Sequence, residues 1–310
     1  NFLNHRIKLA KSVIIALSTN MIKKIIFFIS SKSIFLIEKL IFLTTNKSFL
    51  AWHKEFIESL SYKKIEILNS KISFFVPNHL VEWRVDTFYK TEPETLEWID
   101  SFENKDNLVF WDIGANIGLY SIYNSLKNKN STTIAFEPST SNLRVLSRNI
   151  SINNLDSKIK IFTPPLTNVE NKFLTMKEST FREGGAMHSF GGSFDFEGKK
   201  FSSKMNYKIF GTNINFLIDN KILDIPDYIK IDVDGIEHLI LEGGSKYLKD
   251  KKIKSLSVEI NENFTEQMTK VLDIMEKNNF KILHKKQDAD TFGDNSKHIY
   301  SRIFNYIFVR

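Results

Sequence analysis

Residues 108–118, LVFWDIGANIG, decide the fold. They form an apolar run that includes Asp112 and passes through Gly114 and Gly118 into the helical pattern LYSIYNSL. Gly114 allows backbone angles that a side chain would forbid, and Gly118 lets the following helix pack closely. A strand that leads through such a turn into a helix is typical of α/β domains in which a ligand approaches the carboxyl end of the strand.

The spacing of the turn favours one kind of ligand. A dinucleotide fingerprint needs Gly-x-Gly-x-x-Gly to seat a pyrophosphate, whereas this chain has Asp-x-Gly-x-x-x-Gly. The carboxylate of Asp112 would repel a pyrophosphate but suits a cationic ligand that bears an amino acid. S-adenosylmethionine has both an ammonium and a sulfonium. We therefore expect Asp112, Gly114, Asn116 and Gly118 to bind S-adenosylmethionine.

A second acidic residue supports this cofactor. The run Ile134-Ala-Phe-Glu137-Pro138 ends a predicted strand in Glu137, 19 residues after Gly118. An acid at the end of the second strand is well placed to accept hydrogen bonds from both ribose hydroxyls. The order and spacing of the two motifs predict that Glu137 binds the cofactor.

Short apolar runs alternate with helical stretches on both sides of these motifs, which predicts βαβ units and a mainly parallel sheet. We predict a seven-stranded Rossmann-like α/β domain that is preceded by a β-hairpin at 64–77 and a helix at 91–102. Main strands are expected at 108–113, 132–136, 159–162, 228–233 and 256–260, and a closing hairpin at 280–285 and 303–309.

The strings FVPNHLVEWRVDTFYKTEPETLEWID, FWDIGANIGLYS, FEPS and IKIDVDGIEHLILEGG cover most of residues 74–260. Together they make the chain resemble the FkbM family of methyltransferases. The resemblance implies S-adenosylmethionine-dependent transfer of a methyl group to oxygen, most simply to a sugar hydroxyl of a surface glycan or of its lipid-linked precursor. It also implies that the region of Arg84 and Glu92 closes over the methionine end of the cofactor, with Arg84 near the acceptor.

Methylation of a hydroxyl requires removal of its proton, and candidate bases should project from strand ends beside the cofactor. Asp232, Asp234, Glu237 and His238 lie at the end of the predicted strand at 228–233, and Asp232 is also expected to bind the cofactor. The alternative is that Asp232 only orders the cofactor loop and that Glu237 and His238 begin a helix, where the dipole favours acids. Two carboxylates without further ligands are weak evidence for a metal, and we predict none.

Residues 181–201 contain five of the chain's twelve glycines and should form either a lid or acceptor-binding hairpin, or a flexible surface insertion spanning about 178–210. Arg182 and His188 are its candidate substrate contacts. The Pro164-Pro165 pair lacks a leading Asn or Asp and is not expected to be catalytic. Residues 288–294 echo a calcium loop without its final glutamate, so a polar loop is expected there.

Residues 1–50 hold eight basic residues and Glu38 as the single acid, which accounts for the whole formal net charge of +7. Their Ile, Leu and Phe residues are interrupted by lysines, and the longest uncharged stretch, 12–22, is shorter than the ~18–20 residues of a transmembrane helix. We expect residues 1–60 to form basic, apolar helices. They either contact an anionic membrane peripherally or cap the domain at 61–310 or a partner subunit.

The composition, with 42% hydrophobic and 25% charged residues, is that of a globular protein. The absence of cysteine excludes disulfides and thiolate sites, so we expect a cytoplasmic protein, at the inner face of the membrane if residues 1–50 bind lipid. Residues 51–310 have a formal net charge of zero, which argues against nucleic acid as a partner. An RNA methyltransferase and a non-catalytic scaffold of the same fold stay as alternatives, and the oligomeric state is left open.

Overall fold

The computed structural model describes residues 2–192, 198–201, 203–287 and 301–310, with side chains from residue 21 onward. The chain divides into two compact units, residues 1–61 and 62–310. The predicted polar loop at 288–294 lies outside the described residues.

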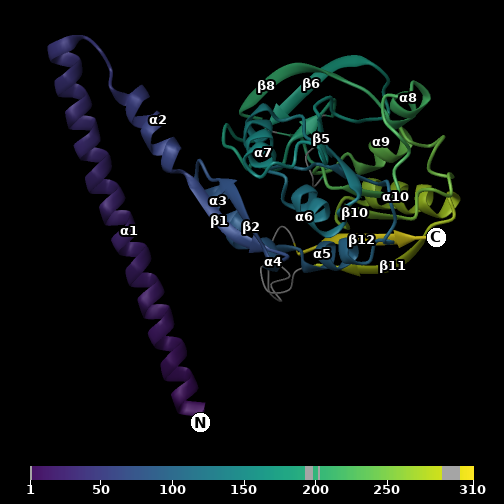
Figure 1. Ribbon diagram of the computed structural model, residues 1–310, viewed down its shortest axis with the longest axis horizontal. Coiled ribbons are helices and arrows are strands. Elements are labelled where there is room, and N and C mark those ends of the chain that lie inside the picture. The colour runs from purple at the N-terminus through teal and green to yellow at the C-terminus, as the bar shows by residue number, and fades with distance from the viewer. Residues whose placement is uncertain (1, 193–197, 202, 288–300) are drawn as a thin grey trace. The chain divides into compact units, whose positions relative to one another are not determined.

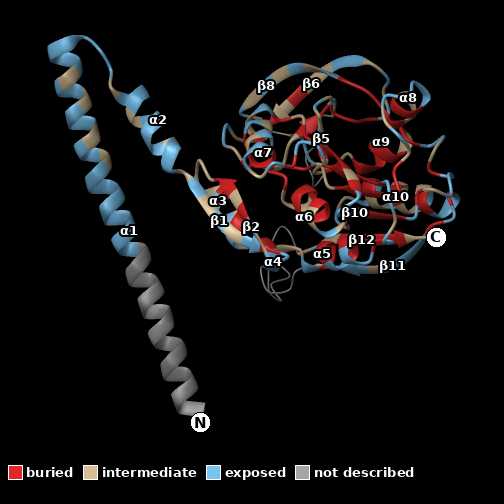
Figure 2. Ribbon diagram, in the orientation of Figure 1, coloured by how far each residue is buried: buried red, intermediate tan, exposed pale blue. Residues whose placement is uncertain are grey.

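The first unit consists of two helices, α1 (Phe2–Thr45) and α2 (Leu50–Leu60). From residue 21 to residue 60 none of its side chains is buried, as Figure 2 shows by the absence of red in both helices. The five consecutive residues 25–29 are each at least half exposed, so apolar side chains surround α1. In the part of the chain that the structure describes, no helix has the length and apolar character needed to cross a membrane.

The second unit is built on a seven-stranded sheet with the order β11-β12-β10-β9-β3-β4-β5. Figure 1 shows β10, β12 and β11 near the C-terminus. All neighbours are parallel except β12, which runs antiparallel to both β10 and β11. The strands are β3 (Leu108–Ile113), β4 (Ser131–Phe136), β5 (Ile159–Phe162), β9 (Tyr228–Ile231), β10 (Ser255–Asn261), β11 (Lys281–Lys286) and β12 (Ile303–Val309). This topology confirms the predicted Rossmann-like sheet. Strand order reverses between β3 and β9, where such sheets bind ligands.

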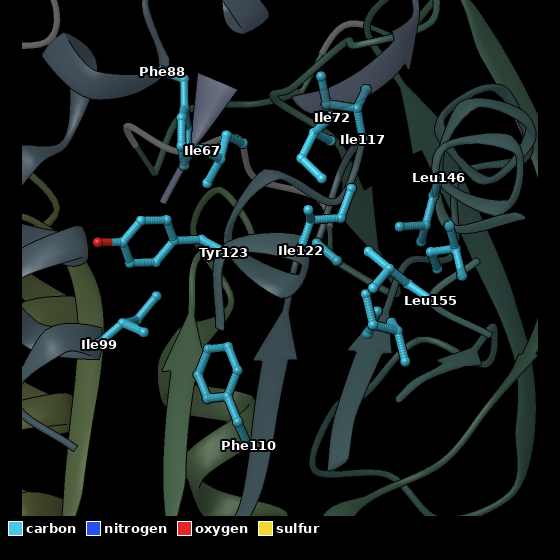
Figure 3. Close-up of a cluster of buried hydrophobic side chains, with 14 of the residues drawn as sticks. Ile67, Ile72, Phe88, Ile99, Phe110, Ile117, Ile122, Tyr123, Leu146 and Leu155 are labelled. Atoms are coloured by element: carbon cyan, nitrogen blue, oxygen red, sulfur yellow. The ribbon is translucent and has the colours of Figure 1, made fainter. Parts of the chain in front are cut away.

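Both faces of the sheet are covered because successive side chains of a strand point to opposite faces. Leu108 and Phe110 of β3 join one core, and Val109, Trp111 and Ile113 join the other. The first core packs on α5 (Pro93–Asp100), α6 (Leu119–Lys127) and α7 (Thr140–Ile152), and Figure 3 shows Ile99, Ile122 and Leu146 from these helices in the same cluster as Phe110. The second core packs on α8 (Ile214–Asp219), α9 (Glu237–Glu242) and α10 (Thr265–Lys277).

The remaining elements lie around this frame. The antiparallel hairpin of β1 (Tyr62–Ile67) and β2 (Ser70–Phe75) was predicted and adds Ile67 and Ile72 to the first core. It is followed by α3 (His79–Asp86) and α4 (Phe88–Thr91). A three-stranded antiparallel sheet was not predicted. It contains β7 (Ser189–Phe190), β6 (Lys172–Glu178) and β8 (Met205–Gly211), so part of the expected insertion is regular structure.

Candidate active site

A glycine-rich turn carries the chain from β3 into α6 and touches the loop that follows β9. Gly114 has a φ of +91°, and a Cβ at this position would lie 1.8 Å from the backbone oxygen of Asp232. Gly118 has a φ of +90°, and its Cβ would lie 2.6 Å from Cδ1 of Leu146. Both positions need glycine for conformation and for space. Asn116, between them, adopts a φ of +50°, which asparagine tolerates better than most residues.

Asp112 ends β3 beneath this turn and is 1% exposed. Its Oδ2 accepts a 2.6 Å hydrogen bond from the Ser121 hydroxyl, and its Oδ1 has no hydrogen-bond partner among the described residues. Burial raises the pKa of Asp112, and the charge of Lys230 acts in the opposite direction. A buried carboxylate oxygen without a partner is costly, so this position favours a ligand that donates a hydrogen bond or carries positive charge.

Lys230 is the buried cation of the site. It lies opposite Asp112 in the β3–β9 ladder, is 1% exposed, and places its Nζ 2.5 Å from Oδ2 of Asp232. Burial alone would lower its pKa, but the carboxylates of Asp232, Glu92 and Asp112 raise it. Lys230 therefore stays charged and compensates a group of carboxylates that come from three separate elements.

Glu137 follows β4 and connects two loops. Its Oε2 accepts the backbone N–H of Asn116 at 2.8 Å, and its Oε1 accepts the backbone N–H of Ser139 at 2.8 Å. Burial raises the pKa of Glu137 to about 8, although these hydrogen bonds act in the opposite direction. Each carboxylate oxygen can accept a second hydrogen bond, so Glu137 can order the glycine-rich turn and bind hydroxyl groups at the same time.

Three adjoining pockets open at the carboxyl ends of β3, β4, β9 and β10. The Pro164 pocket contains Phe136, Glu137, Pro138, Pro164, Pro165, Leu166 and His188. The Tyr120 pocket contains Trp83, Arg84, Glu92, Asn116, Tyr120 and Lys230. The Glu259 pocket, of about 340 Å³, contains Trp83, Arg84, Glu92, Glu94, Glu259, Lys286, Phe304 and Asn305. Asp232, Asp234 and Ala186 line all three, so the pockets meet at these residues.

Residues 184–187 of the glycine-rich segment form a strap against this junction. The carbonyl oxygen of Gly185 accepts hydrogen bonds from Asn116 Nδ2 at 2.9 Å and from Asn142 Nδ2 at 3.1 Å. The backbone N–H of Met187 donates to Oδ2 of Asp234 at 2.6 Å. The strap therefore contacts the turn after β3, helix α7 and the loop after β9.

The structure brings most predicted site residues to these pockets, but not all. Arg84 lines two of them while its Nε donates to the carbonyl of Gly184 at 2.7 Å, and His188 lines the Pro164 pocket, where burial lowers its pKa. Arg182 is exposed, contacts Nε2 of His79 at 3.0 Å and lines none of the three pockets. This position argues against a direct contact between Arg182 and a substrate in these pockets.

Glu237 and His238 also lie away from the reaction centre. Glu237 is fully buried and accepts hydrogen bonds from the backbone N–H groups of Val233 and Gly235, so it orders the loop after β9. His238 is 6% exposed and packs edge-on to the ring of Phe264. Neither lines any of the three pockets. The two predicted bases that do line them are Asp232 and Asp234.

Several pocket residues were missed from the sequence. Lys230 and Glu259 are charged residues within otherwise apolar strands, and that contrast was an available signal. No signal in the sequence pointed to Tyr120, because α6 also contains Tyr123 and nothing distinguishes the two tyrosines. Trp83 is 42% exposed at the pockets, whereas Trp98 is 4% exposed and belongs to the first core. The Pro164-Pro165 pair lines one of the pockets.

A family model described as the methyltransferase FkbM domain matches residues 112–282, which include Asp112, Glu137, Lys230, Asp232 and Glu259. The chain belongs to this family. The chain is also 31% identical over 159 residues to methyltransferase sdnD of Sordaria araneosa. That match covers 43% of this chain and 58% of the relative, so it spans less than two thirds of the relative's length.

Solved structures resemble the FkbM domain at low identity. Fibrillarin of Methanococcus jannaschii is 13% identical with a TM-score of 0.43, over 80% of this chain and 82% of that one. Precorrin-6y C5,15-methyltransferase of Geobacter metallireducens is 15% identical with a TM-score of 0.41, over 71% and 86%. TrmK of M. capricolum, solved with S-adenosyl-homocysteine, is 13% identical with a TM-score of 0.38, over 69% and 66%.

The cofactor of this FkbM domain is S-adenosylmethionine, and the pockets fit it. The carboxylates of Glu92 and Asp232 suit the cationic methionine end at the Tyr120 pocket. Asp112 lines none of the three pockets, so it acts on this site from beneath the glycine-rich turn. Glu137 would accept the ribose hydroxyls, and the mainly apolar lining of the Pro164 pocket suits the adenine. Among the described residues, no group of three or more His, Asp or Glu side chains could hold a metal ion.

Proposed function

We propose that this FkbM domain transfers the methyl group of S-adenosylmethionine to a hydroxyl oxygen, most simply on a sugar of a surface glycan or of its lipid-linked precursor. One observation carries the proposal. Asp232 and Asp234 line the two pockets that suit the cofactor and also the Glu259 pocket beside them. Carboxylates at such a junction can accept the proton that a hydroxyl loses when its oxygen is methylated.

The two aspartates have different roles in this proposal. Asp232 is ion-paired with Lys230, which fixes the position of its carboxyl group near the methionine end. Asp234 has a φ of +63°, and burial followed by the charge of Asp232 raises its pKa to about 7. A carboxylate with a pKa near neutrality is well matched to general-base catalysis, so Asp234 accepts the hydroxyl proton.

The bound cofactor would supply the methyl group from its sulfonium, which becomes a neutral thioether after transfer. The chain mainly has to position the acceptor oxygen in line with that group, because orientation is worth as much as about 7–11 kcal/mol. The strap at 184–187 lines all three pockets through Ala186, and Arg84 holds it through Gly184. These contacts keep the acceptor and cofactor pockets adjacent.

Replacing Asp234 with asparagine tests the proposal. We expect kcat for labelled methyl transfer to a panel of methyl glycosides to fall by roughly 10²–10⁴-fold, while the Kd for S-adenosylhomocysteine changes little. Wild-type activity should rise as the pH rises through about 7, because the base acts only when deprotonated, and the variant should lose this rise.

Glu276→Gln, an exposed substitution on α10, is the matched control. Total RNA serves as a rival acceptor in the same assay. Faster transfer to RNA than to every glycoside would reject a sugar acceptor, and undiminished activity of the Asp234 variant would reject the assigned base. A wild type that binds S-adenosylhomocysteine but methylates nothing would favour the non-catalytic scaffold.

We also propose that the first unit contacts an anionic membrane surface peripherally. Its apolar side chains surround α1, and a helix that is apolar on all sides is unfavourable in water. Lys23, Lys24, Lys32 and Lys39 are interspersed with them, with Glu38 as the acid within the described part of this helix. Each lysine close to an anionic membrane surface contributes about 1 kcal/mol to binding, so this unit should bind an anionic membrane more tightly than a neutral one.

Flotation of the full chain with liposomes tests this contact. We expect binding to vesicles that contain phosphatidylserine, weaker binding to pure phosphatidylcholine, and loss of the difference when Lys23, Lys24, Lys32 and Lys39 are all changed to glutamate. A control with the same change of charge replaces four lysines of the second unit, Lys221, Lys249, Lys251 and Lys281. Equal binding of the two variants to anionic vesicles would disprove the proposal.

A further inference from the structure

The Glu259 pocket is strongly acidic. Its lining includes five carboxylates and two cations, and the carboxylates come from the start of α5, the loop after β9 and strand β10. Such a lining repels phosphate and carboxylate groups and attracts positive charge. An acceptor with an anionic group beside its reactive hydroxyl would therefore be excluded.

The cations near the pocket are largely engaged elsewhere. The Nζ of Lys286 lies 2.6 Å from Glu97 on the outer side of α5. Lys230 is ion-paired with Asp232 and does not line this pocket. Arg84 donates its Nε to the strap. None of these three cations is ion-paired with Glu94 or Glu259, which line the pocket on the side of α5 and β10.

Two glutamates on that side have no cationic partner among the described residues. Glu94 is 2% exposed, and its Oε1 accepts a 2.9 Å hydrogen bond from Asn305 Nδ2, which is a neutral donor. Glu259 has neither an ion pair nor a side-chain hydrogen bond in the described part of the chain. Burial and the charges of Asp232 and Asp234 raise its pKa well above the ordinary value. A cationic group in the pocket would stabilise both carboxylates.

Aromatic side chains from two other elements complete the pocket. Trp83 of α3 is 42% exposed, and Phe304 of β12 lies on the same lining. Aromatic faces can pack against the apolar face of a sugar ring and attract a nearby cation. The pocket thus combines an apolar surface for a ring with carboxylates for a positive charge.

We propose that the acceptor is an amino sugar, whose protonated amine is bound by Glu259 and Glu94 while a hydroxyl of the same ring faces Asp234. This inference rests on the proposed function and specifies its acceptor. A protonated amine has no lone pair for the methyl group, so oxygen remains the methylated atom. Trp83 and Phe304 would position the ring.

Ligand-observed NMR with the full chain saturated with S-adenosylhomocysteine tests the inference. The probes are D-glucosamine, N-acetyl-D-glucosamine, D-glucose and D-glucose 6-phosphate, at a pH where the free amine is protonated. We expect glucosamine to bind roughly 10- to 100-fold more tightly than the neutral sugars, as charge-assisted hydrogen bonds would give. The phosphate should bind most weakly.

Glu259→Gln should reduce the preference for glucosamine to a few-fold and leave the affinity for S-adenosylhomocysteine unchanged, whereas Glu276→Gln should preserve it. Equal signals from glucosamine and glucose, including no signal from either, would overturn the inference. So would an unchanged preference in the Glu259 variant. Failure of S-adenosylhomocysteine to bind would instead reject the proposed function, so the two failures can be distinguished.

Discussion

Replacing Lys230 with methionine should destabilise the protein by about 3–5 kcal/mol, because a buried ion pair that loses one partner leaves a buried charge uncompensated. Lys230 is 1% exposed and lies among the carboxylates of Asp112, Asp232 and Glu92. Methionine keeps the length and apolar contacts of the side chain. The expected loss therefore comes from charge and not from a cavity.

The pH dependence of unfolding identifies this cause. Without Lys230 the buried carboxylates hold their protons more tightly in the folded chain than in the unfolded chain. The variant should therefore lose stability as the pH rises from about 5 to 8, because the folded state then binds more protons than the unfolded state. Denaturant unfolding across this range, beside Lys160→Met on the exposed side of β5, provides the measurement. A pH-independent loss would indicate packing instead.

Alanine at Gly114 should be nearly as damaging. Its Cβ would lie 1.8 Å from the backbone oxygen of Asp232 and 2.9 Å from the adjoining carbon, and a φ of +91° disfavours any side chain. Because backbone atoms cannot swing aside, β3 and β9 would have to separate where the pockets meet. We expect about 100-fold or greater loss of affinity for S-adenosylhomocysteine and destabilisation of roughly 3 kcal/mol or more.

Calorimetric titration and thermal unfolding test the Gly114 prediction. Gly244→Ala is the matched control, since its nearest neighbours are side-chain atoms of Ile214 at 3.1 Å or more and its φ is not in the left-handed region. Retention of cofactor affinity within a few-fold in Gly114→Ala would show that the turn can move away from Asp232, contrary to this structure.

The strands of the seven-stranded sheet could be predicted because the sequence signal for each one lies within the strand and its immediate neighbours. Each main strand is a short apolar run beside a recognisable helix or turn, as in residues 108–118. The three-stranded sheet of β6, β7 and β8 was missed, because β7 has only two residues and only the alternating pattern of β8 indicates a strand. Their pairing joins segments far apart in the chain, which periodicity does not reveal.

The cofactor residues could likewise be predicted from local sequence, whereas the acceptor pocket depends on contacts between distant segments. Asp112 and Glu137 each terminate a strand beside a turn, so their roles could be inferred from neighbouring residues. Glu259 gains its role only because β10 lies beside β9 and faces Glu94 of α5 across a pocket. His238 shows the opposite case. It is only four residues from Asp234 in the sequence, but it lies in the first turn of α9 and lines none of the three pockets.

The contact between Gly114 and the oxygen of Asp232 joins the two halves of the sheet where strand order reverses. A nascent chain that has completed only β3, β4 and β5 therefore lacks one wall of the binding site. Cofactor capture during synthesis would have to wait until β9 has been added. Ligand binding by this protein is thus a signal that both halves have assembled.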